Sequence, residues 1–103
     1  MAAQSTVKMG LFVRLIAKEG KERAVEDFLR SGLEIVQAEP GTVQWYAVRF
    51  DRRTFGIFDT FADEQGRNAH LSGRVAAALM AKAEDLLAEP PRIEKHDILA
   101  SKT

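Results

Sequence analysis

The residue types best suited to chemistry lie in the middle of this 103-residue sequence, within residues 42–71, which also contain its only Trp and its only Tyr. An unperturbed histidine has a pKa near ~6.5, so His70 suits a general base that takes a phenolic proton before an aromatic substrate reacts with oxygen. Asp59 falls in a strand-like run, where a buried carboxylate needs a partner such as Tyr46, Arg49 or His70. Asp59 is therefore predicted either to pair with a neighbour for stability or to line a polar spot in a pocket. His70 and Asp59 are the candidate catalytic residues.

Several side chains near this pair could bind a flat substrate. Aromatic rings stack on planar molecules, although aromatic residues on a sheet also serve as core or subunit contacts. We predict that substrate binding involves Trp45, Tyr46, Phe58, Phe61 and Arg49.

Metal and thiol chemistry are not expected. The chain has no cysteine and only two histidines, and neither histidine stands in a metal-ligand motif. His96, in a later strand-like run, is interpreted as structural or exposed.

Charge and hydropathy narrow the classes of partner. Fifteen Lys and Arg balance fifteen Asp and Glu, so the basic excess typical of nucleic-acid binding is missing. The first apolar run is interrupted by Lys8, Arg14 and Lys18, which excludes a signal peptide or a membrane span there. We expect no nucleic acid or membrane partner, a cytoplasmic location, a disordered tail over residues 1–6, and one domain over residues 7–103.

Hydrophobic periodicity predicts the order of the elements. Alternation over residues 7–17 indicates a strand, and a helical stripe from Gly20 to about Ala38 ends at Pro40-Gly41. Strands over 42–50 and 54–61 form a hairpin, and a helix over 62–71 with an acidic start is followed by a longer helix with Ser72 as its N-cap. A last strand is expected over 93–100.

The hairpin register decides which aromatic residues share a face. If Arg52-Arg53 forms the loop, Phe50 lies opposite Phe55 and Tyr46 lies opposite Asp59, while Trp45 shares the other face with Phe58. A change of one residue in the loop would reverse every facing.

The order β, α, β, β, α, β predicts an α+β, ferredoxin-like fold, with a four-stranded antiparallel sheet backed by two helices. One sheet face would then carry bulky side chains without cover. Because monomers rarely expose large apolar patches, we expect a homodimer whose sheets pack face to face.

Four short motifs then indicate a family. They are Glu39-Pro40-Gly41-Thr42, the run Phe-Gly-Ile-Phe-Asp-Thr-Phe over 55–61, Asp63-Glu64, and Ala69-His70-Leu71. In this order and spacing the chain resembles the antibiotic biosynthesis monooxygenase-like (ABM) family of the dimeric α+β barrel superfamily. The resemblance implies a dimeric barrel that oxidises small electron-rich aromatics, such as quinols or anthrones, with molecular oxygen as co-substrate and with no other cofactor.

The sequence departs from that family at two points. Asp59 and Phe61 stand where many members have Glu and Trp. The alternative function is therefore a non-catalytic dimeric barrel that binds a small hydrophobic ligand or acts in a stress response. Haem degradation is disfavoured because the first strand has no Asn, and an RNA-recognition module is disfavoured by Thr54, Ile57 and the zero net charge.

Overall fold

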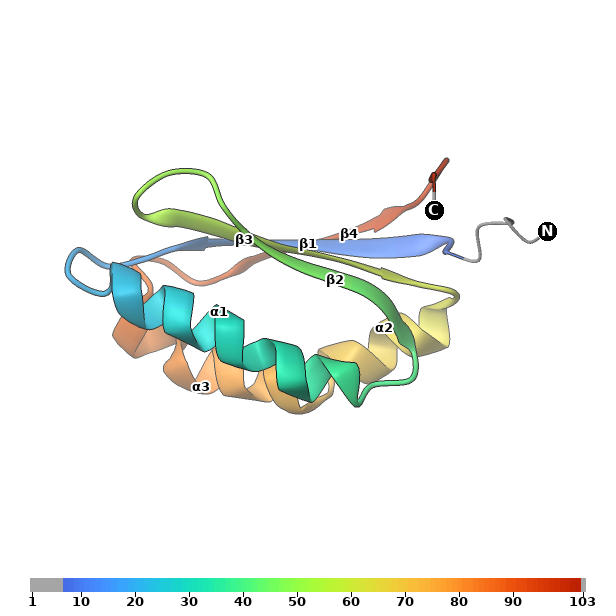
Figure 1. Cartoon of the computed structure of the whole chain (residues 1–103), viewed down its shortest axis with the longest axis horizontal. Coiled ribbons are helices and arrows are strands. Elements are labelled where there is room, and N and C mark those ends of the chain that lie inside the picture. The colour runs from blue at the N-terminus through green and yellow to red at the C-terminus, as the bar shows by residue number, and fades with distance from the viewer. Residues whose placement is uncertain (1–6, 103) are drawn as a thin grey trace.

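Three helices lie on one face of a twisted four-stranded sheet, and the other face carries no helix (Figure 1). The computed structural model describes residues 7–102, so the tail predicted over 1–6 lies outside the described residues. The elements in chain order are β1 (Met9–Ile16), α1 (Glu22–Gln37), β2 (Thr42–Arg49), β3 (Thr54–Phe61), α2 (Glu64–Leu71), α3 (Arg74–Leu86) and β4 (Arg92–Asp97).

The strands are ordered β2-β3-β1-β4 and every neighbouring pair is antiparallel. This is the ferredoxin-like arrangement, and it confirms the predicted α+β fold class. The helix predicted over 62–71 and the longer helix predicted after it correspond to α2 and α3, so three helices back the sheet.

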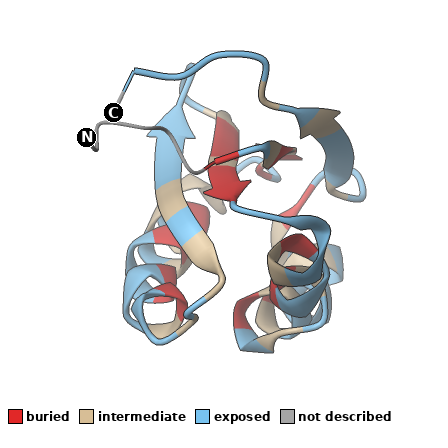
Figure 2. Ribbon diagram, turned by 90° about the vertical axis from the view of Figure 1, so that its right-hand side faces the viewer, coloured by how far each residue is buried: buried red, intermediate tan, exposed pale blue. Residues whose placement is uncertain are grey.

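The core lies between the sheet and the helices (Figure 2). Strand side chains alternate between the two faces, so β1 and β3 each direct every second residue toward the helices. The helix-facing residues of these strands are buried: Leu11, Val13, Leu15, Phe55, Ile57, Asp59 and Phe61. Asp59 is the one carboxylate among these apolar side chains.

The helices cover this layer with the predicted stripes. In α1 the buried residues are Val25, Leu29, Gly32 and Val36, spaced three or four apart, and α3 buries Val75 and Leu79. Asp63 is the N-cap of α2, and its side chain accepts a hydrogen bond from the amide of Gly66.

The prediction that Ser72 caps the following helix is wrong. Ser72 is the C-cap of α2, and its hydroxyl donates to the Asn68 and Ala69 carbonyls, while Gly73 precedes α3 without a side-chain cap. A hydroxyl committed to the preceding turn is not available to the next helix.

The predicted hairpin register is also wrong by one residue. Arg49 lies opposite Phe55 and Trp45 lies opposite Asp59, so Trp45 faces the helices. A two-residue loop at Arg52-Arg53 would need a turn with positive φ, and no non-glycine residue between 7 and 102 has positive φ. Instead the Asp51 carboxylate accepts hydrogen bonds from the amides of Arg53 and Thr54 and holds a longer loop.

The corrected register places Tyr46 on the face without helices, opposite Phe58. The ring of Phe58 stacks on Tyr46 on one side, with centroids 6.5 Å apart, and on His96 on the other, with centroids 5.7 Å apart. His96 packs directly over Gly10, so a Cβ at residue 10 would collide with the imidazole. The uncovered face is therefore rich in aromatic groups, and Tyr46 and Phe50 are 51% and 55% exposed.

Candidate active site

His70, in the last turn of α2, lies between two carboxylates. Its Nδ1 is 2.6 Å from Oε1 of Glu39, and its Nε2 is 2.9 Å from Oδ2 of Asp59. His70 is only 7% exposed and Asp59 is fully buried. Glu39, His70 and Asp59 thus form a carboxylate–imidazole–carboxylate triad at the border between sheet and helices.

The two carboxylates change the protonation of His70. Burial by itself lowers the pKa of His70, but the contacts with Asp59 and Glu39 outweigh burial and raise the pKa above its ordinary value of 6.5. The two carboxylates therefore favour the protonated imidazolium over the neutral ring. In that form both ring nitrogens carry protons and face carboxylates.

Asp59 has spare capacity to accept hydrogen bonds. Its Oδ2 makes an ion-pair contact with His70 that lacks the alignment of a hydrogen bond, and its Oδ1 has no hydrogen-bond partner among residues 7–102. A buried carboxylate oxygen without a donor is costly, so such an oxygen is a reasonable place to find a functional group.

The loop before β2 places Glu39 beside His70. Thr42 donates its hydroxyl to Oε1 of Glu39 over 2.8 Å. The loop also touches the first turn of α2 at two glycines, where a Cβ on Gly41 would lie 2.9 Å from the Gly66 Cα and one on Gly66 would lie 2.8 Å from the Gly41 oxygen. Only residues without side chains allow this close approach.

A small cavity adjoins the triad. It has a volume of about 40 Å³, and its lining includes Asp59, His70 and Trp45 together with apolar side chains of β1, α1 and α3. The buried Nε1 of Trp45 also has no hydrogen-bond partner in the described chain. A space of this size holds a water-sized polar group.

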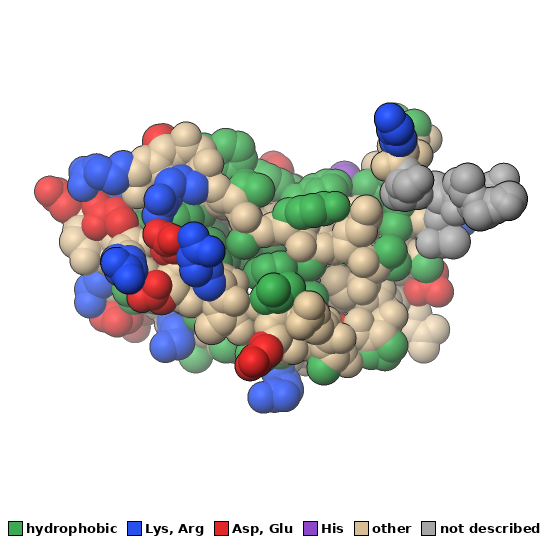
Figure 3. Space-filling model, viewed as in Figure 1, with side chains coloured by type: hydrophobic (Ala, Val, Ile, Leu, Met, Phe, Trp, Pro, Cys, Tyr) green, Lys and Arg blue, Asp and Glu red, His purple; other side chains and the backbone are tan. Residues whose placement is uncertain are grey.

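A larger groove of about 580 Å³ runs along the surface between α1 and β2. Leu29 and Trp45 line both the groove and the cavity, so the two spaces are neighbours. In Figure 3 hydrophobic side chains gather over β2 and the space between it and α1, while charges of both signs gather at the end where α1 begins.

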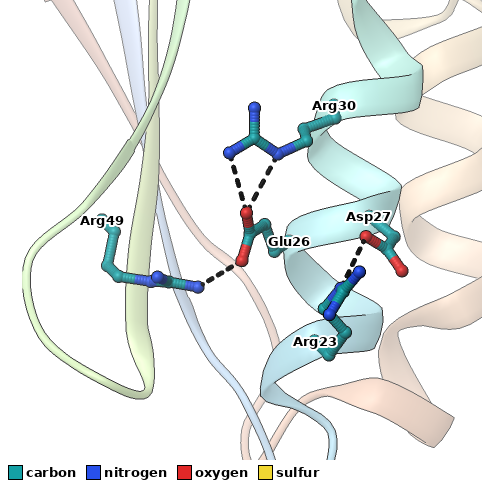
Figure 4. A network of polar contacts seen from close by, with 5 residues as sticks. All are labelled: Arg23, Glu26, Asp27, Arg30 and Arg49. Carbon is teal, nitrogen blue, oxygen red and sulfur yellow. Dashed lines mark hydrogen bonds and ion pairs between the residues drawn. The ribbon is translucent and has the colours of Figure 1, made fainter.

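Arg49 lies at the edge of the groove and away from the triad. Its guanidinium contacts Glu26 over 2.7 Å, and Glu26 also holds Arg30 over 2.8 Å (Figure 4). The same guanidinium lies 4.9 Å from the centre of the Phe55 ring. Arg49 is thus held in place at the rim of the groove.

The structure brings together four of the predicted site residues and separates three. Phe61 is fully buried with its ring 5.5 Å from His70, so the helix-facing group comprises His70, Asp59, Trp45 and Phe61. Tyr46 and Phe58 lie on the uncovered face, and both Tyr46 and Arg49 also line the groove. Which of them touch a substrate stays a prediction.

Two residues of the site region were not predicted. Glu39 was expected only as part of the motif Glu39-Pro40-Gly41-Thr42, and that motif was the one sequence signal that Glu39 belongs to the site. Arg67 is buried on α2 three residues before His70, and it donates to the carbonyl oxygens of Gly10 and His96. Its position one helical turn from His70 was the only sequence signal that it faces inward.

Residues 7–102 contain no group of three or more His, Cys, Asp or Glu side chains arranged to hold a metal ion. No helix in the same range is long and apolar enough to cross a membrane. The cytoplasmic location stays a prediction.

Comparison with solved structures identifies the fold. A protein described as an antibiotic biosynthesis monooxygenase superposes with a TM-score of 0.78 at 13% identity, covering 89% of this chain and 99% of that one. Rv0793 from Mycobacterium tuberculosis superposes with a TM-score of 0.82 at 14% identity, covering 93% of this chain and 99% of that one. The fold is that of the antibiotic biosynthesis monooxygenase-like proteins, as the sequence resemblance predicted.

A nearer relative defines the family itself. The NE2512 protein of unknown function from Nitrosomonas europaea is 55% identical, with a TM-score of 0.94 over 97% of each chain. The chain belongs to the same family as NE2512. No protein-family model matches the sequence, and no curated protein matches it.

Proposed function

We propose that this protein is a monooxygenase that oxidises a small electron-rich aromatic with molecular oxygen and needs no other cofactor. One observation carries the proposal: a buried carboxylate with an unpartnered oxygen is held beside the imidazole of His70 at the wall of a cavity next to an aromatic-lined groove. Such a carboxylate can accept a proton from a bound molecule out of contact with bulk water. The fold shared with a monooxygenase supports the proposal.

The reaction begins with proton removal. Loss of a phenolic or benzylic proton converts an anthrone or quinol into an electron-rich anion, which can pass an electron to dioxygen. Recombination gives a hydroperoxide; in the anthrone case a methylene group becomes a carbonyl, one oxygen atom enters the product and the other leaves as water. The substrate supplies all the electrons, so the protein needs to bind, orient and move protons.

Asp59 and His70 divide the proton chemistry. Oδ1 of Asp59 is the acceptor with a free lone pair, whereas both nitrogens of His70 already face carboxylates. When protonated, the imidazole of His70 offsets the negative charge of the Asp59 carboxylate. His70 therefore acts in this proposal as a base only together with Asp59.

The proposed functional unit is a homodimer with its uncovered sheet faces packed together. Phe12, Phe50, Phe58 and Tyr46 lie on that face, and Arg14 lies 5.2 Å from the centre of the Phe50 ring and 5.8 Å from that of Phe12. A surface this rich in aromatic groups is unusual on a monomer. Its contacts would also keep the sheet rigid behind the triad.

Oxygen consumption tests the proposal. The protein at micromolar concentration is incubated with a panel of dihydroxyanthracenes and naphthohydroquinones, first without air and then with air, and uptake is compared with autoxidation. We expect uptake above autoxidation for at least one substrate, and about a hundredfold less with Asp59→Asn. Asp85→Asn, an exposed α3 substitution, is the control and should keep full activity. Uptake that never exceeds autoxidation across the panel would overturn the proposal.

One observation favours the alternative of a binding protein without chemistry. The cavity beside Asp59 is only about 40 Å³, so a ring system must stay largely in the groove, away from the carboxylate. A non-catalytic barrel would bind such a molecule and release it unchanged after exposure to air. Chromatography of the recovered ligand separates the two functions.

A further inference from the structure

Two buried polar atoms of opposite character belong to residues that line the same cavity, Trp45 and Asp59. Nε1 of Trp45 is a hydrogen-bond donor only, and Oδ1 of Asp59 is an acceptor when ionised. Neither atom has a partner among residues 7–102, and both are inaccessible to solvent. Trp45 and Asp59 are also direct neighbours across β2 and β3, which places both side chains on the helix-facing side.

A group that satisfies both atoms must accept from the indole and donate to the carboxylate. A hydroxyl does both. A ketone or ether oxygen would accept from Trp45 but leave Asp59 without a donor, and a carboxylate would be repelled by Asp59. The cavity volume of about 40 Å³ matches a hydroxyl and does not accommodate a ring.

We propose that the cavity is a recognition site for an aromatic hydroxyl, with Trp45 Nε1 donating to the hydroxyl oxygen and Asp59 accepting its proton. The ring system lies in the groove between α1 and β2, which shares the lining residues Trp45 and Leu29 with the cavity. This inference rests on the proposed function and narrows its substrate class to phenols, including hydroxylated anthrones and quinols. Trp45 then also stabilises the phenolate oxygen when the proton leaves, as a donor aimed at developing charge.

The chain offers a direct readout because Trp45 is its only tryptophan. Three matched probes are titrated without air: α-naphthol, its methyl ether and naphthalene. Binding is followed by the fluorescence of Trp45 and by calorimetry. We expect α-naphthol to bind about tenfold more tightly than its methyl ether, because the ether leaves the buried carboxylate oxygen without a donor. Equal affinities would overturn the inference, and a site filled by water alone would give that result.

Variants separate the two halves of the site. Trp45→Phe keeps an aromatic ring but removes the N–H, so calorimetry should show about tenfold weaker binding of α-naphthol and unchanged binding of naphthalene. Asp59→Asn should reduce the preference for α-naphthol over its ether, and Asp85→Asn should keep it. If Trp45→Phe binds α-naphthol as well as the unaltered protein does, Trp45 is not a donor to the ligand and the inference fails.

These measurements are independent of turnover. A protein that prefers α-naphthol but consumes no oxygen with any substrate would retain the hydroxyl site and lose the monooxygenase proposal. Oxygen consumption without a preference for the hydroxyl in binding would retain the monooxygenase proposal and rule out the hydroxyl site.

Discussion

The Glu39 carboxylate lies 2.6 Å from Nδ1 of His70, although the two residues are 31 positions apart in the chain. Glu39 follows the end of α1, and His70 is in the last turn of α2. Their contact depends on the close approach of Gly41 and Gly66, which brings the loop before β2 against α2. The contact that favours protonation of His70 thus relies on a backbone approach between two glycines, and these glycines take no part in the proposed proton transfer.

Substitution of either glycine should therefore disturb the triad. In Gly41→Ala the new methyl group would lie 2.9 Å from the Gly66 Cα, so the loop must move away from α2. We expect a loss of about 1–3 kcal/mol in the free energy of unfolding and a lower His70 pKa, measured by urea denaturation and by NMR titration. Gly66→Ala should give the same two changes. Unaltered titration of His70 in both variants would contradict this account.

Stability should depend on pH through His70. Pairing raises the pKa of His70 in the folded protein above its unfolded value of 6.5. The stabilising contribution is therefore fully present below the unfolded pKa and is lost as the pH rises through the folded pKa, and a tenfold change in proton affinity corresponds to about 1.4 kcal/mol. Urea denaturation between pH 6 and 9 measures this loss. In His70→Gln the free energy of unfolding should vary by no more than ~0.5 kcal/mol over the same pH range. Parallel curves for the two proteins would show that the triad does not hold the proton.

Removal of the Asp59 charge should destabilise the fold strongly. Asp59→Asn leaves the imidazolium of His70 with one carboxylate in a buried site, and breaking a buried ion pair costs about 3 kcal/mol or more. The free energy of unfolding should fall by that amount and the pKa of His70 should fall with it. Asp85→Asn is the matched control, since the Asp85 side chain is 76% exposed and 3.9 Å from Lys21, and it should change stability by less than about 0.5 kcal/mol. Equal stability of the two variants would contradict the role of Asp59.

The proposed dimer contact through the uncovered sheet face can be tested by measuring the mass of the protein in solution. Phe58→Arg places a charge among the stacked rings of Tyr46 and His96, where dimer burial would be costly. Light scattering should give about twice the chain mass of 11.5 kDa for the unaltered protein and 11.5 kDa for the variant. Met80→Arg, at an exposed position on α3, is the control and should stay dimeric. A monomer mass for the unaltered protein at working concentration would rule out the proposed homodimer.

The amino-acid sequence by itself determined the elements and their order. Alternation over β1 and the stripe that includes Val25 and Leu29 are local patterns with periods of two and 3.6 residues, and such patterns follow from backbone geometry alone. Stops such as Pro40-Gly41 are equally local. These features were sufficient for the ferredoxin-like fold.

Only the tertiary structure decided which side chains meet. The hairpin register depended on Asp51 binding the Arg53 and Thr54 amides, and this choice placed Trp45 rather than Tyr46 beside Asp59. The sequence marked His70 and Asp59 as candidates, but the third member, Glu39, reaches them across a glycine contact between distant segments. Register and long-range contacts depend on the packing of the whole chain, because a shift of one residue in a strand changes its face while leaving its periodicity intact.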